Sequence, residues 1–143
     1  MTNVNSKIHI YRPAQDVFKF ISNPENNPQW QGGMVSCEIT SDGAWGLGST
    51  YSQKAKFMGR DIISTFKISQ FEPGRLIRGD TVESSFPISF TRIVEPAEEG
   101  CMVQAIVTGD ASGFIKIFTP LMNWMVKRSI DGDYRRLKEL LEG

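Results

Sequence analysis

The spacing of apolar residues changes along the chain, and each change marks a new element. Residues 4–11 alternate between apolar and polar, with Ile8 and Ile10 on one face, which predicts a half-buried strand. Pro13 suits the first position of a helix, and the apolar residues from Val17 to Ile21 then follow a helical spacing. A first strand followed by a short helix is therefore predicted.

A second short helical turn is predicted over residues 23–30. Asn23 stands before Pro24, and a residue before proline avoids helical geometry, so the first helix ends there. Pro28 keeps the second turn short. Trp30 follows this turn directly.

From Met34 onward the pattern predicts six further strands joined by short turns. The strands cover approximately residues 35–39, 51–57, 62–69, 76–82, 86–90 and 102–108. Short connections between successive strands indicate an antiparallel meander, which has one dry face that another element must cover. The face of the 76–82 strand that points inward is not decided by the pattern, so Arg78 and Asp80 could lie inside or outside.

The last thirty residues predict a long amphipathic helix from about Phe114 to Leu141 that covers this dry face. Pro120 either kinks this helix or marks its true start. Gly132 lies mid-helix, where glycine costs about 1 kcal/mol relative to alanine. It either permits a close approach of helix and sheet or allows a bend.

Composition excludes several classes of function. The 143 residues suit one domain spanning residues 1–143, with no metal or disulfide needed for folding. Sixteen basic and sixteen acidic residues cancel, which gives no electrostatic footprint for nucleic acid and no polybasic membrane anchor. A single histidine, His9, makes a zinc site improbable, and Cys37 and Cys101 are interpreted as buried free thiols. No cofactor is predicted.

The N-terminus lacks the apolar region of a signal peptide, and no apolar run approaches the ~20 residues of a membrane span. A cytoplasmic location is therefore expected.

Several short motifs resemble the polyketide cyclase/dehydrase branch of the START-like (SRPBCC) superfamily. They are residues 12–14, 17–26 with Trp30, 46–51, 71–76 and 90–96, and together they span nearly the whole chain. The resemblance implies an α+β helix-grip fold, in which a seven-stranded curved antiparallel sheet wraps around the long C-terminal helix, with two short helices after the first strand. It also implies a cavity between sheet and helix, since members of this superfamily bind lipids, sterols, polyketides, plant hormones and quinones.

Such a cavity is expected to be mostly apolar with a few polar groups. The candidate ligand-binding residues are Trp30, Tyr51, Gln53, Ser64, Arg78, Met122 and Met125. Each has a simpler interpretation beside this one. Arg78 and Asp80 could form an exposed or structural ion pair, Tyr51 could be a core tyrosine bonded to the backbone, and Trp30, Met122 and Met125 could serve packing alone.

The favoured function is binding or carriage of a small hydrophobic molecule, such as a lipid, a polyketide or an aromatic compound. A polyketide cyclase/dehydrase-type enzyme is the alternative, with Tyr51, Gln53 and Arg78 as the residues that would polarise carbonyls or move protons. No recognisable catalytic motif is present: there is no G-x-S-x-G elbow and no glycine-rich phosphate loop. A third hypothesis is a protein-interaction or quinone-chaperone-like module, and a strand edge or the outer helix face could pair two copies into a homodimer.

Overall fold

The computed structural model describes residues 2–57, 59–83, 87–109 and 119–143, with side chains for all of these except 2, 57 and 119–122. The elements are β1 (Thr2–Ile10), α1 (Ala14–Ile21), the 3-10 helix η1 (Pro24–Gln29), β2 (Met34–Ile39), β3 (Thr50–Phe57), β4 (Arg60–Glu72), β5 (Leu76–Glu83), β6 (Ile88–Ala97), β7 (Gly100–Gly109) and α2 (Thr119–Glu142). Phe86, Phe114 and Phe118 of the predicted apolar pattern lie outside the described residues.

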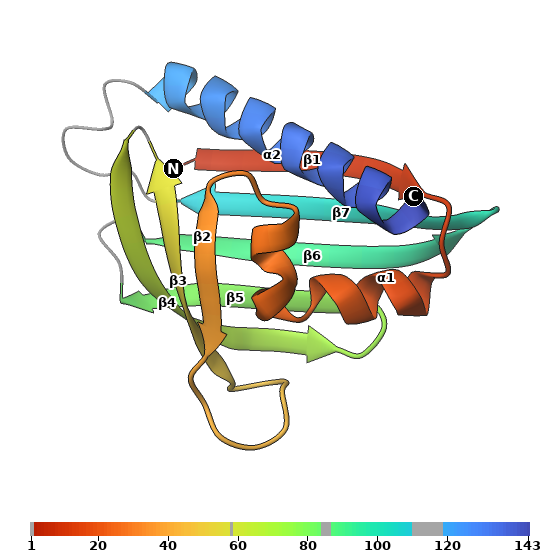
Figure 1. Cartoon of the computed structure of the whole chain (residues 1–143), viewed down its shortest axis with the longest axis horizontal. Coiled ribbons are helices and arrows are strands. Elements are labelled where there is room, and N and C mark those ends of the chain that lie inside the picture. The colour runs from red at the N-terminus through yellow and green to blue at the C-terminus, as the bar shows by residue number, and fades with distance from the viewer. Residues whose placement is uncertain (1, 58, 84–86, 110–118) are drawn as a thin grey trace.

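Seven strands of the described chain form one antiparallel sheet in the order β1-β7-β6-β5-β4-β3-β2. Figure 1 shows that the sheet is strongly curved: β1 and β7 run across the view, while β2 and β3 stand nearly upright. Helix α2 packs along β1, and η1 packs on β2. Because these helices cover the concave side of a curved antiparallel sheet, the predicted helix-grip fold is confirmed.

The two short helices occur where they were predicted, with small differences. Pro13 caps α1 in an extended conformation (φ −57°, ψ 140°), so it precedes the helix instead of opening it. The second helix is a 3-10 helix, and the Asn23 side chain caps it by accepting a 3.0 Å bond from the amide of Glu25. Pro28 within it supplies no amide, which is compatible with a short 3-10 segment.

The inward face of β5 is set by its pairing with β6. Ile77 pairs with Arg92, Arg78 with Thr91, and Gly79 with Phe90. Because directly paired residues share a face, Ile77 and Gly79 point inward with Arg92, and Arg78 points outward.

Helix α2 as described begins at Thr119, which places Pro120 in its first turn. A proline is tolerated there because the first amides of a helix have no partner within it. Gly132 does not mark a close approach to the sheet, since a Cβ at this position would meet nothing within 4 Å.

Hydrogen bonds to other parts of the described chain are concentrated in the second half of α2. Besides the contact of Tyr134 with Arg92, six hydrogen bonds of 2.6–3.0 Å join α2 to other described parts of the chain. They are Asp131 with Ser6, Asp133 with the amide of Gly32, Arg136 with the Trp30 carbonyl, Lys138 with the His9 carbonyl, the Leu141 carbonyl with Arg12, and Glu142 with the amide of Tyr11. All six lie at or after residue 131. No comparable bond joins residues 123–130 to another described element, and Ile130 is the residue of this segment that packs against the described core.

Candidate functional site

Aromatic rings gather on the concave face of the sheet. Tyr51 on β3 is 2% exposed and stacks on Phe66 of β4 with ring centroids 5.2 Å apart and planes 10° apart. Phe90 of β6 contacts both rings at 6.4 and 5.5 Å, and Trp45 meets Tyr51 edge-on at 6.1 Å. These rings come from β3, β4 and β6, with β5 between the last two, and from one loop. Because each ring contacts another, they form a continuous apolar wall inside the fold.

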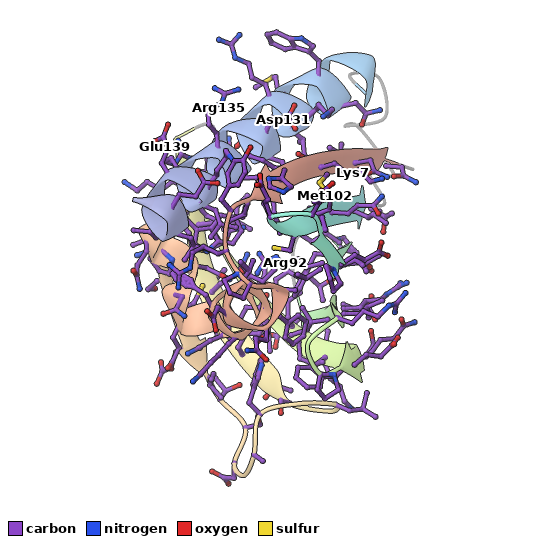
Figure 2. All side chains as sticks on the ribbon, turned by 90° about the vertical axis from the view of Figure 1, so that its right-hand side faces the viewer. Lys7, Arg92, Met102, Asp131, Arg135 and Glu139 are labelled. Atoms are coloured by element: carbon purple, nitrogen blue, oxygen red, sulfur yellow. The ribbon has the colours of Figure 1, made fainter. Side chains whose placement is uncertain are left out.

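Arg92 lies in the middle of this interior, and Figure 2 shows it between the sheet and the helices, whereas Arg135 and Glu139 project from the outer side of α2. Its side chain is 6% exposed. The Nη1 atom donates to the carbonyl of Ile21 at 2.9 Å and to Oδ1 of Asn27 at 3.3 Å. The guanidinium therefore ties the end of α1 and the 3-10 helix to β6.

Two rings enclose the guanidinium of Arg92. Its carbon lies 4.9 Å from the Trp30 ring centroid and 5.0 Å from the Phe90 ring centroid, both within the range of cation–π attraction. None of the ion pairs of the described residues involves Arg92. Its direct partners are thus neutral acceptors and aromatic rings.

Tyr134 and Trp30 close the side of the site nearest α2. Their rings meet edge-on with centroids 4.8 Å apart. Burial raises the pKa of the Tyr134 hydroxyl, and the nearby Arg92 guanidinium offsets part of that rise through its charge and a hydrogen bond. Burial likewise raises the pKa of Tyr51, again partly offset by Arg92, so both phenols stay protonated near neutral pH. In that state they can donate a hydrogen bond, and neither is suited to act as a base.

Asp133 is the carboxylate that α2 places beside this group. It accepts a 3.0 Å bond from the amide of Gly32 and pairs with Arg136. Burial nevertheless raises its pKa, an effect that these partners and Arg92 counteract only in part. Asp133 therefore holds α2 against the loop that follows Trp30.

Three buried polar atoms have no hydrogen-bond partner among the described residues: Nε1 of Trp30, Oε1 of Gln31 and Oδ1 of Asn123. An unpaired buried polar atom costs about 1–3 kcal/mol. Two of them belong to the segment beside Arg92, and the third belongs to the first half of α2. The unpaired donor of Trp30 belongs to the ring that lies against the Arg92 guanidinium.

The structure brings only some of the sequence-predicted candidates together. Trp30, Tyr51 and Ser64 are buried, and Gln53 is half-buried between its strand partners Cys37 and Ser64. Met125 is half-buried on the first half of α2, and the side chain of Met122 lies outside the described residues. The simpler interpretation of Trp30 as packing also has support, because its ring contacts Tyr134 and Arg92.

Arg78 lies away from the interior. It is on the outer face of β5, about 39% exposed, and its Nε donates to Asp80 at 3.2 Å. Of the two orientations left open for Arg78, the structure has the outward one, with an exposed ion pair. The buried arginine is Arg92, on the neighbouring strand β6. The sequence did carry a signal for Arg92. The alternating face of Ile88 and Phe90, extended by two residues, reaches Arg92.

A separate surface pocket of about 370 Å³ is lined by His9, Tyr11, Glu98, Glu99 and Lys138. Here Lys138 lies over the Tyr11 ring at 4.7 Å and donates to the His9 carbonyl at 2.7 Å. None of the sequence-predicted candidates lines it. The pocket is open to solvent at the outer end of β1, so it is distinct from the aromatic interior.

The two thiols of Cys37 and Cys101 are free. No group of three or more His, Cys, Asp or Glu side chains gathers closely enough among the described residues to hold a metal ion. In that part of the chain, no helix combines the length and the apolar character that a membrane crossing requires.

Several solved structures share this architecture. A protein of Thermus thermophilus superposes with a TM-score of 0.82 at 16% identity, covering 96% of this chain and 94% of its own. A START superfamily protein from Mycobacterium smegmatis gives 0.74 at 13% identity, covering 96% and 99%. The di-domain ARO/CYC BexL from the BE-7585A biosynthetic pathway gives 0.79 at 19% identity, covering 99% of this chain and 47% of BexL. At these identities the likeness concerns the fold.

The sequence has no match among proteins of curated function. A family model does match, and it spans residues 1–142, nearly the whole chain. Together with the seven-stranded helix-grip architecture, this match places the chain in the polyketide cyclase / dehydrase and lipid transport family.

Proposed function

We propose that the protein binds and carries a small hydrophobic molecule between the concave face of the sheet and helix α2. The observation that carries this proposal is the unequal fastening of α2. Its second half is held by six hydrogen bonds to other elements, while residues 123–130 have none among the described residues. A segment with few hydrogen bonds to its surroundings can separate from the sheet at low cost and admit a ligand.

The chemistry of the interior agrees with this use. The wall of Tyr51, Phe66 and Phe90 offers large apolar rings, and the unpaired polar atoms of Trp30 and Asn123 offer a few directed contacts. Apolar walls with a small number of polar groups are typical of small-molecule sites. The description of the family, which includes lipid transport, supports the same class of ligand.

Native mass spectrometry of protein purified without detergent tests the proposal. We expect a bound apolar molecule, or a thermal shift on addition of lipids and aromatic compounds. Two variants of neighbouring residues on β4 supply the matched control. Ser64→Phe adds a ring on the buried face, where Ser64 is 3% exposed, and Thr65→Phe adds the same ring on the opposite face.

Ser64→Phe should lower ligand occupancy, and Thr65→Phe should leave it unchanged. Equal occupancy in both variants, or the absence of any bound or stabilising apolar ligand for the wild-type chain, would count against carriage.

A cyclase-type activity is the second candidate, favoured by the protonated Tyr51 and the cationic Arg92 in one interior. Both are hydrogen-bond donors that could polarise a carbonyl of a folded polyketone. Turnover of a polyketone that survives both Tyr51→Phe and Arg92→Met would remove these residues from the mechanism. Arg78→Met is the control, because that arginine lies on the outer face.

A further inference from the structure

The charge balance around Arg92 is unusual for a buried ion. A guanidinium does not lose its proton in a protein, so Arg92 stays cationic at 6% exposure. It donates to the Ile21 carbonyl and the Asn27 amide oxygen, which are both neutral, and the nearby Asp133 carboxylate is already paired with Arg136. Removing an ion from water costs several kcal/mol, which neutral acceptors and aromatic rings offset only in part.

The donors around Arg92 outnumber the acceptors. The guanidinium has five N–H groups, and its bonds to Ile21 and Asn27 both come from Nη1. The indole N–H of Trp30, in the ring that stacks on the guanidinium, is buried without a partner. The hydroxyl of Tyr134 stays protonated beside them. A group with negative oxygen atoms would therefore meet several donors and one full positive charge.

We propose that Arg92 is the anchor for an acidic oxygen group, a carboxylate, on the hydrophobic molecule that the interior binds. The apolar body of this ligand would lie against the rings of Tyr51, Phe66 and Phe90, which continue directly from the guanidinium through Phe90. The inference rests on the proposed function and adds the chemical class of the ligand. Figure 2 shows the interior position of Arg92 that it requires.

Arg92 also has a structural role, because it joins α1 and the 3-10 helix to the sheet. That role predicts that replacing Arg92 affects the binding of charged and neutral ligands alike. Anchoring predicts that the replacement removes the preference for the charged ligand. The two roles are therefore separated by comparing matched ligands, and not by loss of binding alone.

The test uses two matched pairs of probes measured by calorimetry at pH 7.5. Dodecanoate against dodecanol represents lipids, and 1-naphthoate against 1-naphthylmethanol represents aromatic compounds. For wild-type protein we expect the carboxylate of at least one pair to bind roughly tenfold or more tightly than its alcohol, which is typical of one charge-assisted contact. The pair that shows the preference identifies the source of the carboxylate.

Arg92→Met should reduce this preference to less than about twofold, while Arg78→Met, which removes an arginine from the outer face, should retain it. Should Arg92→Met fail to fold, Nε–H resonances of the wild-type arginines decide the question. A shift of the Arg92 signal with carboxylate and not with alcohol supports the anchor, and an unchanged signal overturns it.

Equal affinity of wild-type protein for acid and alcohol would overturn the anchor and leave carriage of neutral apolar ligands intact. An unchanged preference in folded Arg92→Met would also overturn it. No binding of any probe, combined with no bound molecule in native mass spectrometry, would instead refute the proposed function itself.

Discussion

Two glycine-to-alanine substitutions should change stability in opposite directions. Gly132 lies in α2, where an added Cβ would meet nothing within 4 Å. Gly79 lies on the inner face of β5, where the same Cβ would stand 2.6 Å from Cε1 and 2.8 Å from Cζ of Phe90. The chemical change is the same, so the surroundings alone decide the sign.

The magnitudes follow from these distances. Gly132→Ala removes the cost of a mid-helix glycine and should stabilise the fold by about 0.5–1 kcal/mol. Gly79→Ala gains a similar entropic term, but it forces the Phe90 ring away by most of an ångström. That ring is held between Tyr51, Phe66 and the Arg92 guanidinium. Overpacking of this kind costs roughly 1–3 kcal/mol, so a net destabilisation of about 0.5–2 kcal/mol is expected.

Urea denaturation followed by far-UV circular dichroism measures both effects. The midpoint should rise for Gly132→Ala and fall for Gly79→Ala, with the same slope, since neither change alters the surface exposed on unfolding. Near-UV circular dichroism should change only for Gly79→Ala, which moves an aromatic ring. A Gly79→Ala protein as stable as wild type would refute the argument that Phe90 is fixed by its neighbours.

Three further predictions concern the fastening of α2, the thiols and the core. Burial raises the pKa of Asp131, but hydrogen bonds from Lys127 and Ser6 outweigh it and hold that pKa below its usual range. The resulting stability is present above the unfolded pKa of about 3.9 and is lost as the pH falls through the folded pKa. Asp131→Asn should therefore have a lower urea midpoint than wild type at pH 7, and this difference should shrink below about pH 4. A difference that stays constant with pH would contradict the prediction. Burial raises the pKa of the Cys37 thiol to about 11, so iodoacetamide at pH 8 should modify it slowly in folded protein and rapidly in urea, as followed by mass spectrometry. Leu137 is 0% exposed, so Leu137→Ala should lower the free energy of unfolding in urea by roughly 2–5 kcal/mol. A decrease of less than about 1 kcal/mol would mean that this face of the helix is not in the core.

The alternation of apolar residues was enough to predict the strands and the covering helix, because period two and period 3.6 leave different traces in a sequence. It failed to decide the face of β5 for a physical reason. Leu76 and Ile77 are both buried although they are neighbours in the strand. The pairing of β4 with β5 also shifts register between Ile68 and Gln70. A bulge changes which residues face inward, so the pattern of one strand cannot reveal it.

The polar contacts of α2 could not be predicted from the sequence for a different reason. The apolar stripe predicts that Ile130, Leu137 and Leu141 face the sheet, and all three belong to or pack against the core. Asp133, by contrast, is buried because its oxygen accepts the amide of Gly32, 101 residues earlier in the chain. Helical periodicity describes one element at a time, whereas such a contact depends on where two distant elements meet.

Both limits apply to Arg92, because the tertiary fold determines the direction in which its side chain points and the groups that it contacts. A neutral side chain that donated to the Ile21 carbonyl and to Asn27 would hold the same elements without the desolvation cost of a buried cation. Negative charge brought to such a cation would offset more of its desolvation cost than neutral partners do. If the ligand does so, its binding energy stabilises the fold by mass action, and stability grows with the concentration of acid in excess of Kd. The interior is then least stable when empty, which is the condition under which the loosely fastened half of α2 has to open.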